Sequence, residues 1–97
     1  MVIKIKKISL NKLLKLKNIN IIDIRDNNEY DEFRISNSIN IPYSELLNNH
    51  IYYINKKDKY YIVCETGYTS KQLIKKLSKY NYHFVYVKKG IKKIMNA

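Results

Sequence analysis

Two compact apolar runs constrain the fold more than any other feature of the sequence. Asn18–Ile24 and Lys59–Val63 are rich in β-branched and aromatic residues and are too short for typical helices. Near-continuous apolar runs of this length are typical of parallel strands that are buried on both faces. Phe84–Val87 is a third run of this kind. We therefore expect a parallel sheet, whose crossover connections usually contain helices.

The segments between these runs carry helical signals. The strongest is Ser70–Tyr80, where Leu73, Ile74, Leu77 and Tyr80 share one face and lysines occupy the others. Three further helices are expected: one capped by Ser9 with Leu10, Leu13 and Leu14 inside, one from Asp26 or Asn27 to Phe33, and one over Glu45–His50 capped by Ser44 with Leu46 and Leu47 inside.

The other expected elements are not helical, apart from a short helical tail after Gly90. They are an edge strand over Val2–Lys6, an extended Asn40–Pro42 and a polar loop over Cys64–Thr69.

This alternation predicts an α/β fold with a mostly parallel central sheet of about five strands and helices on both faces. The crossovers are expected to be right-handed. With 97 residues the chain has the length of one domain, so we expect a single domain over residues 1–97.

Composition excludes several protein classes. The one cysteine excludes an intrachain disulfide framework and a cysteine-rich zinc module. His50 and His83 form no metal-ligand pattern with it, so no metal site is expected. The sequence has no apolar run long enough for a transmembrane helix and no signal-peptide pattern, and a free thiol fits a reducing compartment. We therefore expect a cytoplasmic protein without a membrane partner.

The charge is strongly basic. The chain carries 19 Lys and Arg against 8 Asp and Glu, a formal net charge of +11. Such a surface is a feature of nucleic-acid binders and also attracts small anions. Only two of the 19 basic residues are arginine, the side chain best suited to bidentate phosphate contacts. We therefore favour a compositional bias toward lysine over a nucleic-acid partner, whose binding would fall steeply with salt.

Two polar clusters follow predicted strands. Asp23–Arg25 ends the first buried run, and Cys64–Ser70 follows the second. In parallel sheets ligands bind beyond the carboxyl ends of the strands, so both clusters are candidates for a site. Asp23 and Arg25 are interpreted mainly as supporting residues, because buried charges need partners. Glu29 is a candidate ion-pair partner for Arg25.

The Cys64–Ser70 loop has the features of an anion site. It leads from a buried strand into a helix N-terminus, where backbone N–H groups and the helix dipole favour a thiolate or an anionic substrate. Gly67 supplies the backbone freedom that a tight turn needs. The hydroxyls of Thr66, Thr69 and Ser70 are candidate donors, although Thr69 or Ser70 is equally suited to cap the helix. A cysteine that ends an apolar strand is also consistent with a small buried residue.

The pattern Cys64-x-x-Gly67-x-Thr69-Ser70 resembles the active-site loop of single-domain rhodaneses, a family of sulfurtransferases. Further matches extend over nearly the whole chain: Ile22-Asp23-Ile24-Arg25, Glu29-Tyr30, Ile35, Ile39-Asn40-Ile41-Pro42 and Lys88-Lys89-Gly90. The sequence departs from the family pattern at several positions. Phe33-Arg34 stand where the family often has Gly-His, Asn37 and Lys89 stand where it has glycines, and Ile94 stands in place of a common tryptophan.

The resemblance implies a two-step sulfur transfer. Cys64 would be the nucleophile and would carry the sulfur as a persulfide, with no metal or organic cofactor. Glu65, Thr66, Gly67, Tyr68, Thr69 and Ser70 would form the substrate-binding loop, with Tyr68 as a wall of the pocket. The implied partners are a small sulfur donor (thiosulfate or a persulfide), a thiol acceptor and a sulfur-relay protein.

Glu65 bears on the choice of donor. Relatives that use thiosulfate well often carry Arg or Lys in the loop, whereas this loop has no basic residue, and Glu65 would repel a dianion. Lys71, Lys88, Lys89 and Arg34 are candidates for a positive rim. Both donors stay open.

Of two alternative functions, the sequence argues against the first and leaves the second open. A cysteine phosphatase or arsenate reductase needs an Arg six residues after the cysteine, where this chain has Ser70, and often a His where it has Val63. The other alternative is a non-catalytic rhodanese-like module that binds an anion or senses redox state. Glu65 and the missing glycines favour that module, whereas the joint presence of Cys64, Gly67 and Ser70 favours the enzyme.

Overall fold

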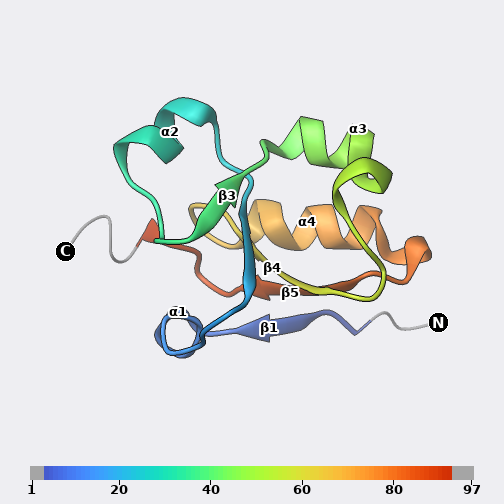
Figure 1. Cartoon of the computed structure of the whole chain (residues 1–97), viewed down its shortest axis with the longest axis horizontal. Coiled ribbons are helices and arrows are strands. Elements are labelled where there is room, and N and C mark those ends of the chain that lie inside the picture. The colour runs from blue at the N-terminus through green and yellow to red at the C-terminus, as the bar shows by residue number, and fades with distance from the viewer. Residues whose placement is uncertain (1–3, 93–97) are drawn as a thin grey trace.

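A computed structural model describes residues 4–92 of the chain. Its sheet has five strands in the order β1-β5-β4-β2-β3, and every neighbouring pair is parallel, so the predicted α/β class and parallel sheet are confirmed (Figure 1). The strands are β1 (Lys6–Ile8), β2 (Asn20–Asp23), β3 (Ser38–Asn40), β4 (Lys59–Val63) and β5 (His83–Val87). The helices are α1 (Leu10–Leu13), α2 (Asn27–Glu32), α3 (Tyr43–Tyr53), α4 (Tyr68–Lys76) and the short 3₁₀ helix η1 (Ser78–Tyr80).

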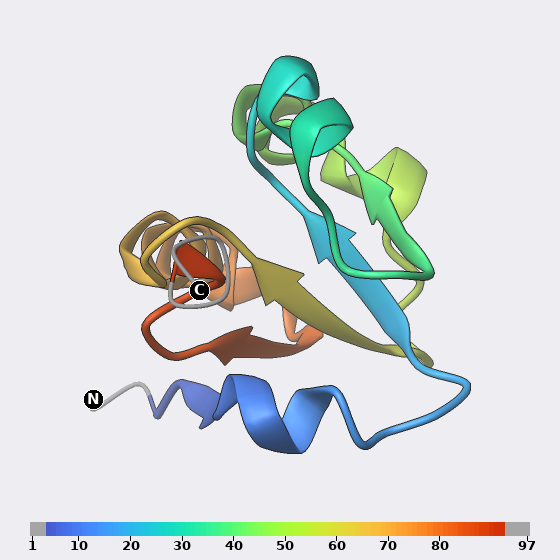
Figure 2. The ribbon, with the colours of Figure 1, turned by 90° about the vertical axis from the view of Figure 1, so that its left-hand side faces the viewer.

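The sheet separates two hydrophobic clusters. One contains Leu46 of α3 and Leu73 of α4, packed with Ile62 of β4. The other contains Leu13 of α1, packed with Val63 of β4. Ile62 and Val63, which are neighbours in β4, thus point to opposite faces of the sheet, as the alternation of side chains in a strand requires. Figure 2 shows α3 and α4 lying away from α1 across the strands, so helices cover both faces as expected.

The two longest compact runs form the middle of the sheet. β4 lies between β5 and β2, with Tyr61 in register with Val85 on one side and Ile21 on the other. Ile62 and Val63 are fully buried. Because β2 and β4 are neighbours and parallel, the residues that follow them emerge at the same edge of the sheet.

The first third of the chain departs from the expectation in the bounds of the edge strand and in the burial of Leu14. The edge strand begins at Lys6 rather than earlier; Val2 and Ile3 lie outside the described residues. Ser9 caps α1 as predicted, accepting a hydrogen bond from Lys12 N at 3.2 Å. Leu14, however, is 51% exposed, because a helix of a single turn directs only Leu13 fully into the core. Asp26, one of the two expected caps, is the N-cap of α2 and forms a capping box that was not predicted.

The two longer helices also begin at other residues than expected. Pro42, and not Ser44, is the N-cap of α3, and its ring-fixed φ of −53° leads the chain into the helix. α3 continues beyond His50 to Tyr53, across a kink at Asn49. α4 begins at Tyr68 rather than Ser70 because Gly67, at φ +93°, occupies the cap position.

The remaining features predicted for α3, α4 and the C-terminal tail are met in part. Leu46 is buried, and Leu47 is half-buried against the same cluster. The expected helix through Tyr80 ends as α-helix at Lys76 and continues as η1. Most of the predicted tail after Gly90, including Ile94, lies outside the described residues. Between residues 4 and 92, no helix is both long enough and apolar enough to cross a membrane.

Candidate active site

The two polar clusters lie side by side at the carboxyl edge of the sheet. Asp23 is the last residue of β2 and is in register with Val63, the last residue of β4. Ile24 N donates to Val63 O at 2.9 Å and continues this pairing one residue further. The Cys64 loop therefore begins next to the segment Ile24–Arg25, as the sequence predicted.

The Cys64 sulfur is the focus of the loop. Gly67 N donates to Sγ at 3.1 Å, and Ser70 N donates to Sγ at 3.3 Å. The residue is only 3% exposed. Two backbone N–H groups at the start of α4 thus point at one sulfur, an arrangement that stabilises negative charge on it.

The turn after β5 holds the loop from behind. Cys64 O accepts from Ile91 N at 3.1 Å, and Glu65 O accepts from Lys92 N at 2.9 Å. Gly90 has no room for a side chain, because a Cβ there would overlap the carbonyl oxygens of Cys64 and Glu65. These contacts set the path of the loop backbone.

Gly67 is confined by the same turn. At its φ of +93° any L side chain would be strained, and a Cβ would lie 2.9 Å from both Lys89 N and Val87 O. Gly67 therefore serves two purposes: it allows the left-handed backbone before α4, and it lets the loop approach the β5 turn closely.

The remaining loop residues face solvent. Glu65, Thr66 and Thr69 are exposed, and Tyr68 is 69% exposed. Thr66 Oγ1 accepts from Tyr68 N at 3.4 Å. Of the predicted loop set, the structure thus places Gly67 and Ser70 on the sulfur and leaves the others around the outside of the loop.

Asp23 and Arg25 form a buried pair. Arg25 Nη2 lies 2.8 Å from Asp23 Oδ2, and Arg25 N and Nε both donate to Asp23 Oδ1 at 3.0 Å. The same guanidinium donates to Phe33 O, which ties the end of α2 to β2. Glu29 instead takes part in the capping box, where its Oε1 accepts from Asp26 N at 3.4 Å. The arrangement supports a structural role for the pair, because each buried charge has its partner.

The four residues proposed for a positive rim lie on different segments of the structure. Lys88 and Lys89 are exposed on the turn that backs the loop, and Lys71 N donates to Gly67 O at 3.1 Å within α4. Arg34 lies over the Tyr30 ring of α2, with its guanidinium carbon 5.0 Å from the ring centre. Three of the four residues are thus on the segments that build the loop.

Sequence reasoning missed how much the β5 turn contributes to this site. Gly90 was noted only as part of a motif, and Ile91 was not singled out. The available signal was the glycine itself, in a chain that has only two glycines, with the other one in the cysteine loop.

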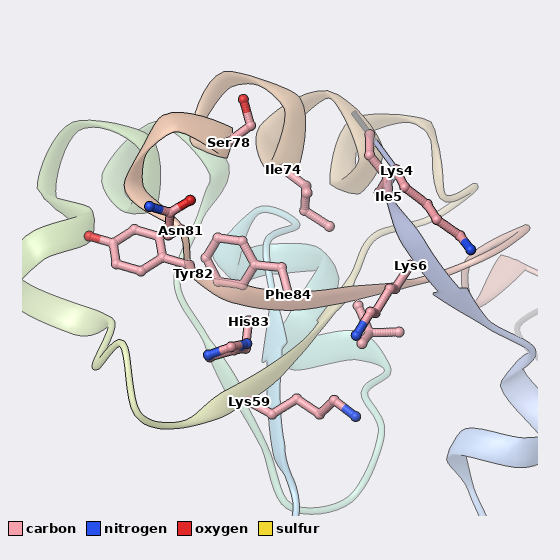
Figure 3. Close-up of a pocket in the computed structure, with 11 residues that line it drawn as sticks. Lys4, Ile5, Lys6, Lys59, Ile74, Ser78, Asn81, Tyr82, His83 and Phe84 are labelled. Carbon is pink, nitrogen blue, oxygen red and sulfur yellow. The ribbon is translucent and has the colours of Figure 1, made fainter. Parts of the chain in front are cut away.

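A separate cavity lies at the opposite end of the sheet. Figure 3 shows Lys59 and His83, the first residues of β4 and β5, at this cavity together with Lys4 and Lys6. Its volume is about 200 Å³, and among the described residues that line it none is a cysteine or a carboxylate. Within residues 4–92 no group of three or more His, Cys, Asp or Glu is placed to hold a metal ion.

Comparison with known proteins gives a consistent result. A model of the Rhodanese-like domain matches residues 7–97 of the chain. A search of the curated proteins found no match. Among solved structures, a rhodanese-like domain protein from Staphylococcus aureus is 31% identical, with a TM-score of 0.77 over 90% of this chain and 88% of that one. A rhodanese-related protein from Thermoplasma volcanium is 29% identical, with a TM-score of 0.82 over 94% of this chain and 91% of that one. A protein from Staphylococcus saprophyticus is 27% identical, with a TM-score of 0.81 over 92% of both chains.

Proposed function

Because the chain belongs to the rhodanese-like domain family, we propose that it is a sulfurtransferase that carries sulfur as a persulfide on Cys64. The observation that carries this proposal is the pair of N–H groups, from Gly67 and Ser70, that converge on Sγ. Donors fixed in this way stabilise the attacking thiolate and also the sulfur anion of the loaded state.

Loading is a displacement at sulfur. The Cys64 thiolate attacks the outer sulfur of a donor R–S–SH, a new Sγ–S bond forms, and the donor's S–S bond breaks. The electron pair of the broken bond leaves with R–S⁻, and the proton stays on the transferred sulfur until the loop donors stabilise its release. No oxidant is consumed, because one S–S bond replaces another.

Unloading is the same displacement in the other direction. The thiolate of an acceptor attacks the outer sulfur, the Sγ–S bond breaks, and Cys64 Sγ recovers the electron pair. Donor and acceptor react with the enzyme in turn, which predicts ping-pong kinetics. Backbone amides and the cysteine suffice for both steps.

The loop composition bears on the partners of the reaction. Glu65 is exposed beside the nucleophile, and its charge disfavours the thiosulfate dianion relative to a persulfide donor. We propose a low-molecular-mass or protein persulfide as donor and a thiol as acceptor, in the cytoplasm, where a lone cysteine stays reduced. A sulfur-relay protein is a natural source of either.

A second candidate is a rhodanese-like module that binds an anion or senses redox state without turnover. The observation that favours it is the burial of Cys64, which is only 3% exposed. The two candidates differ in whether a sulfur atom becomes covalently attached to Cys64.

Intact-mass measurement separates these candidates. The protein is incubated with thiosulfate and, separately, with glutathione persulfide, beside a Cys64→Ala control. The enzyme gains the mass of one sulfur at Cys64, and cyanide removes it as thiocyanate, whereas the control gains nothing. Loading by glutathione persulfide alone would support exclusion of thiosulfate by Glu65. A protein that gains no sulfur from either donor, while Cys64 still reacts with a small alkylating agent, is the non-catalytic module.

A further inference from the structure

The Ser70 hydroxyl has no hydrogen-bond partner in the part of the chain that the structure describes. Ser70 is fully buried, and its Oγ is the buried side-chain oxygen or nitrogen without a partner among residues 4–92. A buried hydroxyl that forms no hydrogen bond is costly, so each one in a native protein needs an explanation. The explanation here comes from the backbone contact between Ser70 and the Cys64 sulfur.

Ser70 is the third residue of α4. Its own N–H already donates to Cys64 Sγ at 3.3 Å, so the residue is in contact with the nucleophile. Helical side chains lean toward the N-terminus of their helix, and the cysteine loop lies at that end of α4. The hydroxyl is thus on the end of the helix where the sulfur lies.

The backbone N–H groups and the Ser70 hydroxyl near Sγ differ in whether they form a hydrogen bond before sulfur is loaded. The N–H groups of Gly67 and Ser70 bind Sγ before any sulfur is loaded. The Ser70 hydroxyl is unused at that stage. Loading adds a second sulfur atom, which is a new acceptor beyond Sγ.

We propose that the Ser70 hydroxyl donates a hydrogen bond to the outer sulfur of the Cys64 persulfide. This inference rests on the proposed sulfurtransferase function. The bond exists only in the loaded state, so it shifts the transfer equilibrium toward loaded enzyme, whereas donors that bind both states equally do not. Ser70 is thereby the residue that distinguishes the loaded protein from the empty one.

The test is an equilibrium measurement. Wild type, Ser70→Ala and Ser70→Thr are each equilibrated with glutathione persulfide in an excess of glutathione, and the loaded fraction is read from the intact mass. A hydrogen bond to a charged acceptor predicts a loaded-to-empty ratio about ten times lower, or lower still, for Ser70→Ala. Ser70→Thr retains a hydroxyl and keeps at least part of the wild-type ratio. Ser78→Ala, which removes a half-buried hydroxyl from η1, leaves the ratio unchanged.

A stability measurement separates this role from a structural one. Removing a buried hydroxyl that lacks a partner leaves the unloaded protein as stable as wild type or more stable, because nothing is lost in the folded state. Urea unfolding of unloaded Ser70→Ala therefore moves in the opposite direction to its loaded fraction. A variant that loses stability in the empty state would instead show that the hydroxyl has a structural partner.

The outcomes also distinguish this inference from the proposed function. Wild type and Ser70→Ala that load equally would overturn the role of Ser70 and leave the sulfurtransferase intact. A Ser70→Ala variant that loads slowly from thiosulfate but reaches the wild-type ratio with glutathione persulfide would assign the hydroxyl to the donor's oxyanion and overturn the inference. A wild type that never loads overturns both.

Discussion

At the scale of single residues, Gly90 shows how the site depends on a position outside the cysteine loop. It lies against the carbonyl groups of Cys64 and Glu65, with no room for a Cβ. Its neighbours in sequence complete the contact, because Ile91 N and Lys92 N donate to those same two carbonyl groups. The loop is therefore held by backbone contacts that only a glycine at position 90 permits.

Gly90→Ala tests this dependence. The new methyl group forces the two segments apart, and both the φ of +60° and the overlap are unfavourable. We expect a loss of about 2–4 kcal/mol in the free energy of unfolding and a large decrease in sulfur loading. Urea unfolding and intact mass measure the two effects.

Lys89→Gly is the matched control for that variant. Lys89 has a φ of +65°, so glycine relieves backbone strain at the neighbouring position without introducing a side chain. Its stability is expected to stay within about 1 kcal/mol of wild type. If both variants lost equal amounts of stability and sulfur loading, the conformation of the turn, and not the lack of space for a side chain at Gly90, would determine the loop structure.

The residues that touch the sulfur were largely predictable from the sequence. Cys64, Gly67 and Ser70 stand in one short loop, so their spacing carried the information. The contact of Gly90 with that loop was not predictable, because it joins segments that are far apart in the chain and meet only through the sheet. Thr69 and Glu65 were predicted to line the site and are exposed: Thr69 lies in the first turn of α4, and Glu65 lies in the loop before it.

At the scale of elements, an aromatic contact joins α3 to the start of β5. His50 Nδ1 lies 2.7 Å from the Tyr82 hydroxyl oxygen, and its ring centre is 4.2 Å from that of Tyr80. Tyr82 continues the contact to Phe84, with ring centres 5.4 Å apart. The C-terminal half of α3 is thereby fixed to the strand that leads to the turn behind the site.

Tyr82 makes this contact sensitive to alkaline pH. Burial and the nearby Tyr80 raise the pKa of the Tyr82 phenol above its ordinary value of 10.0. The unfolded chain therefore releases this proton first, so the stabilising effect is complete below pH about 10 and is lost as the pH rises further. In Tyr82→Phe the loss of stability between about pH 9 and 11 should be shallower than in wild type.

Chemical unfolding at a series of pH values measures this slope. At neutral pH the same variant is expected to lose about 1 kcal/mol, because the hydrogen bond to His50 is absent. Tyr52→Phe is the control, since the Tyr52 side chain is 89% exposed. An unchanged alkaline slope in Tyr82→Phe would contradict the raised pKa.

Element positions were predictable from the sequence to different degrees. The apolar runs located β2, β4 and β5 to within a residue or two, because burial on both faces requires continuous apolar residues. Helix starts were less accurate: Ser44 offered a hydroxyl cap, but Pro42 comes earlier and already directs the chain into α3. The kink at Asn49 left no local signal, so the extension of α3 to Tyr53 was missed.

At the scale of the whole molecule, the net charge of +11 is the dominant long-range property. Lys88 and Lys89 are exposed on the turn after β5, and the residues that follow them, Ile91 and Lys92, donate to the cysteine loop. A field of this sign accelerates the approach of anions and is weakened by salt.

Discharge of the persulfide tests the effect of this field. Sulfite, an anion, and cysteamine, whose attacking thiolate is balanced by its own ammonium group, are compared as acceptors by rapid quench and intact mass. Raising the ionic strength from about 0.01 M to about 0.15 M is expected to slow the sulfite reaction several-fold and to leave the thiol reaction nearly unchanged. Equal salt effects on both acceptors would show that the charge does not steer substrates.

The class of fold followed from the sequence, but the order of its strands did not. Alternating apolar runs and helical segments permit several strand orders. The position of β1 beside β5 depends on pairing between opposite ends of the described chain, with Lys7 in register with Tyr86. Such long-range pairing leaves no local pattern in the sequence.

The pairing of β1 with β5 also orders events during biosynthesis. β1 leaves the ribosome early, yet its partner strand and the turn that supports the cysteine loop are among the later segments to appear. Domains fold as units once their segments are all present. A nascent chain stalled after α4 therefore contains Cys64 without its supporting turn, and the backbone contacts that hold the cysteine loop form only when translation has passed Lys92.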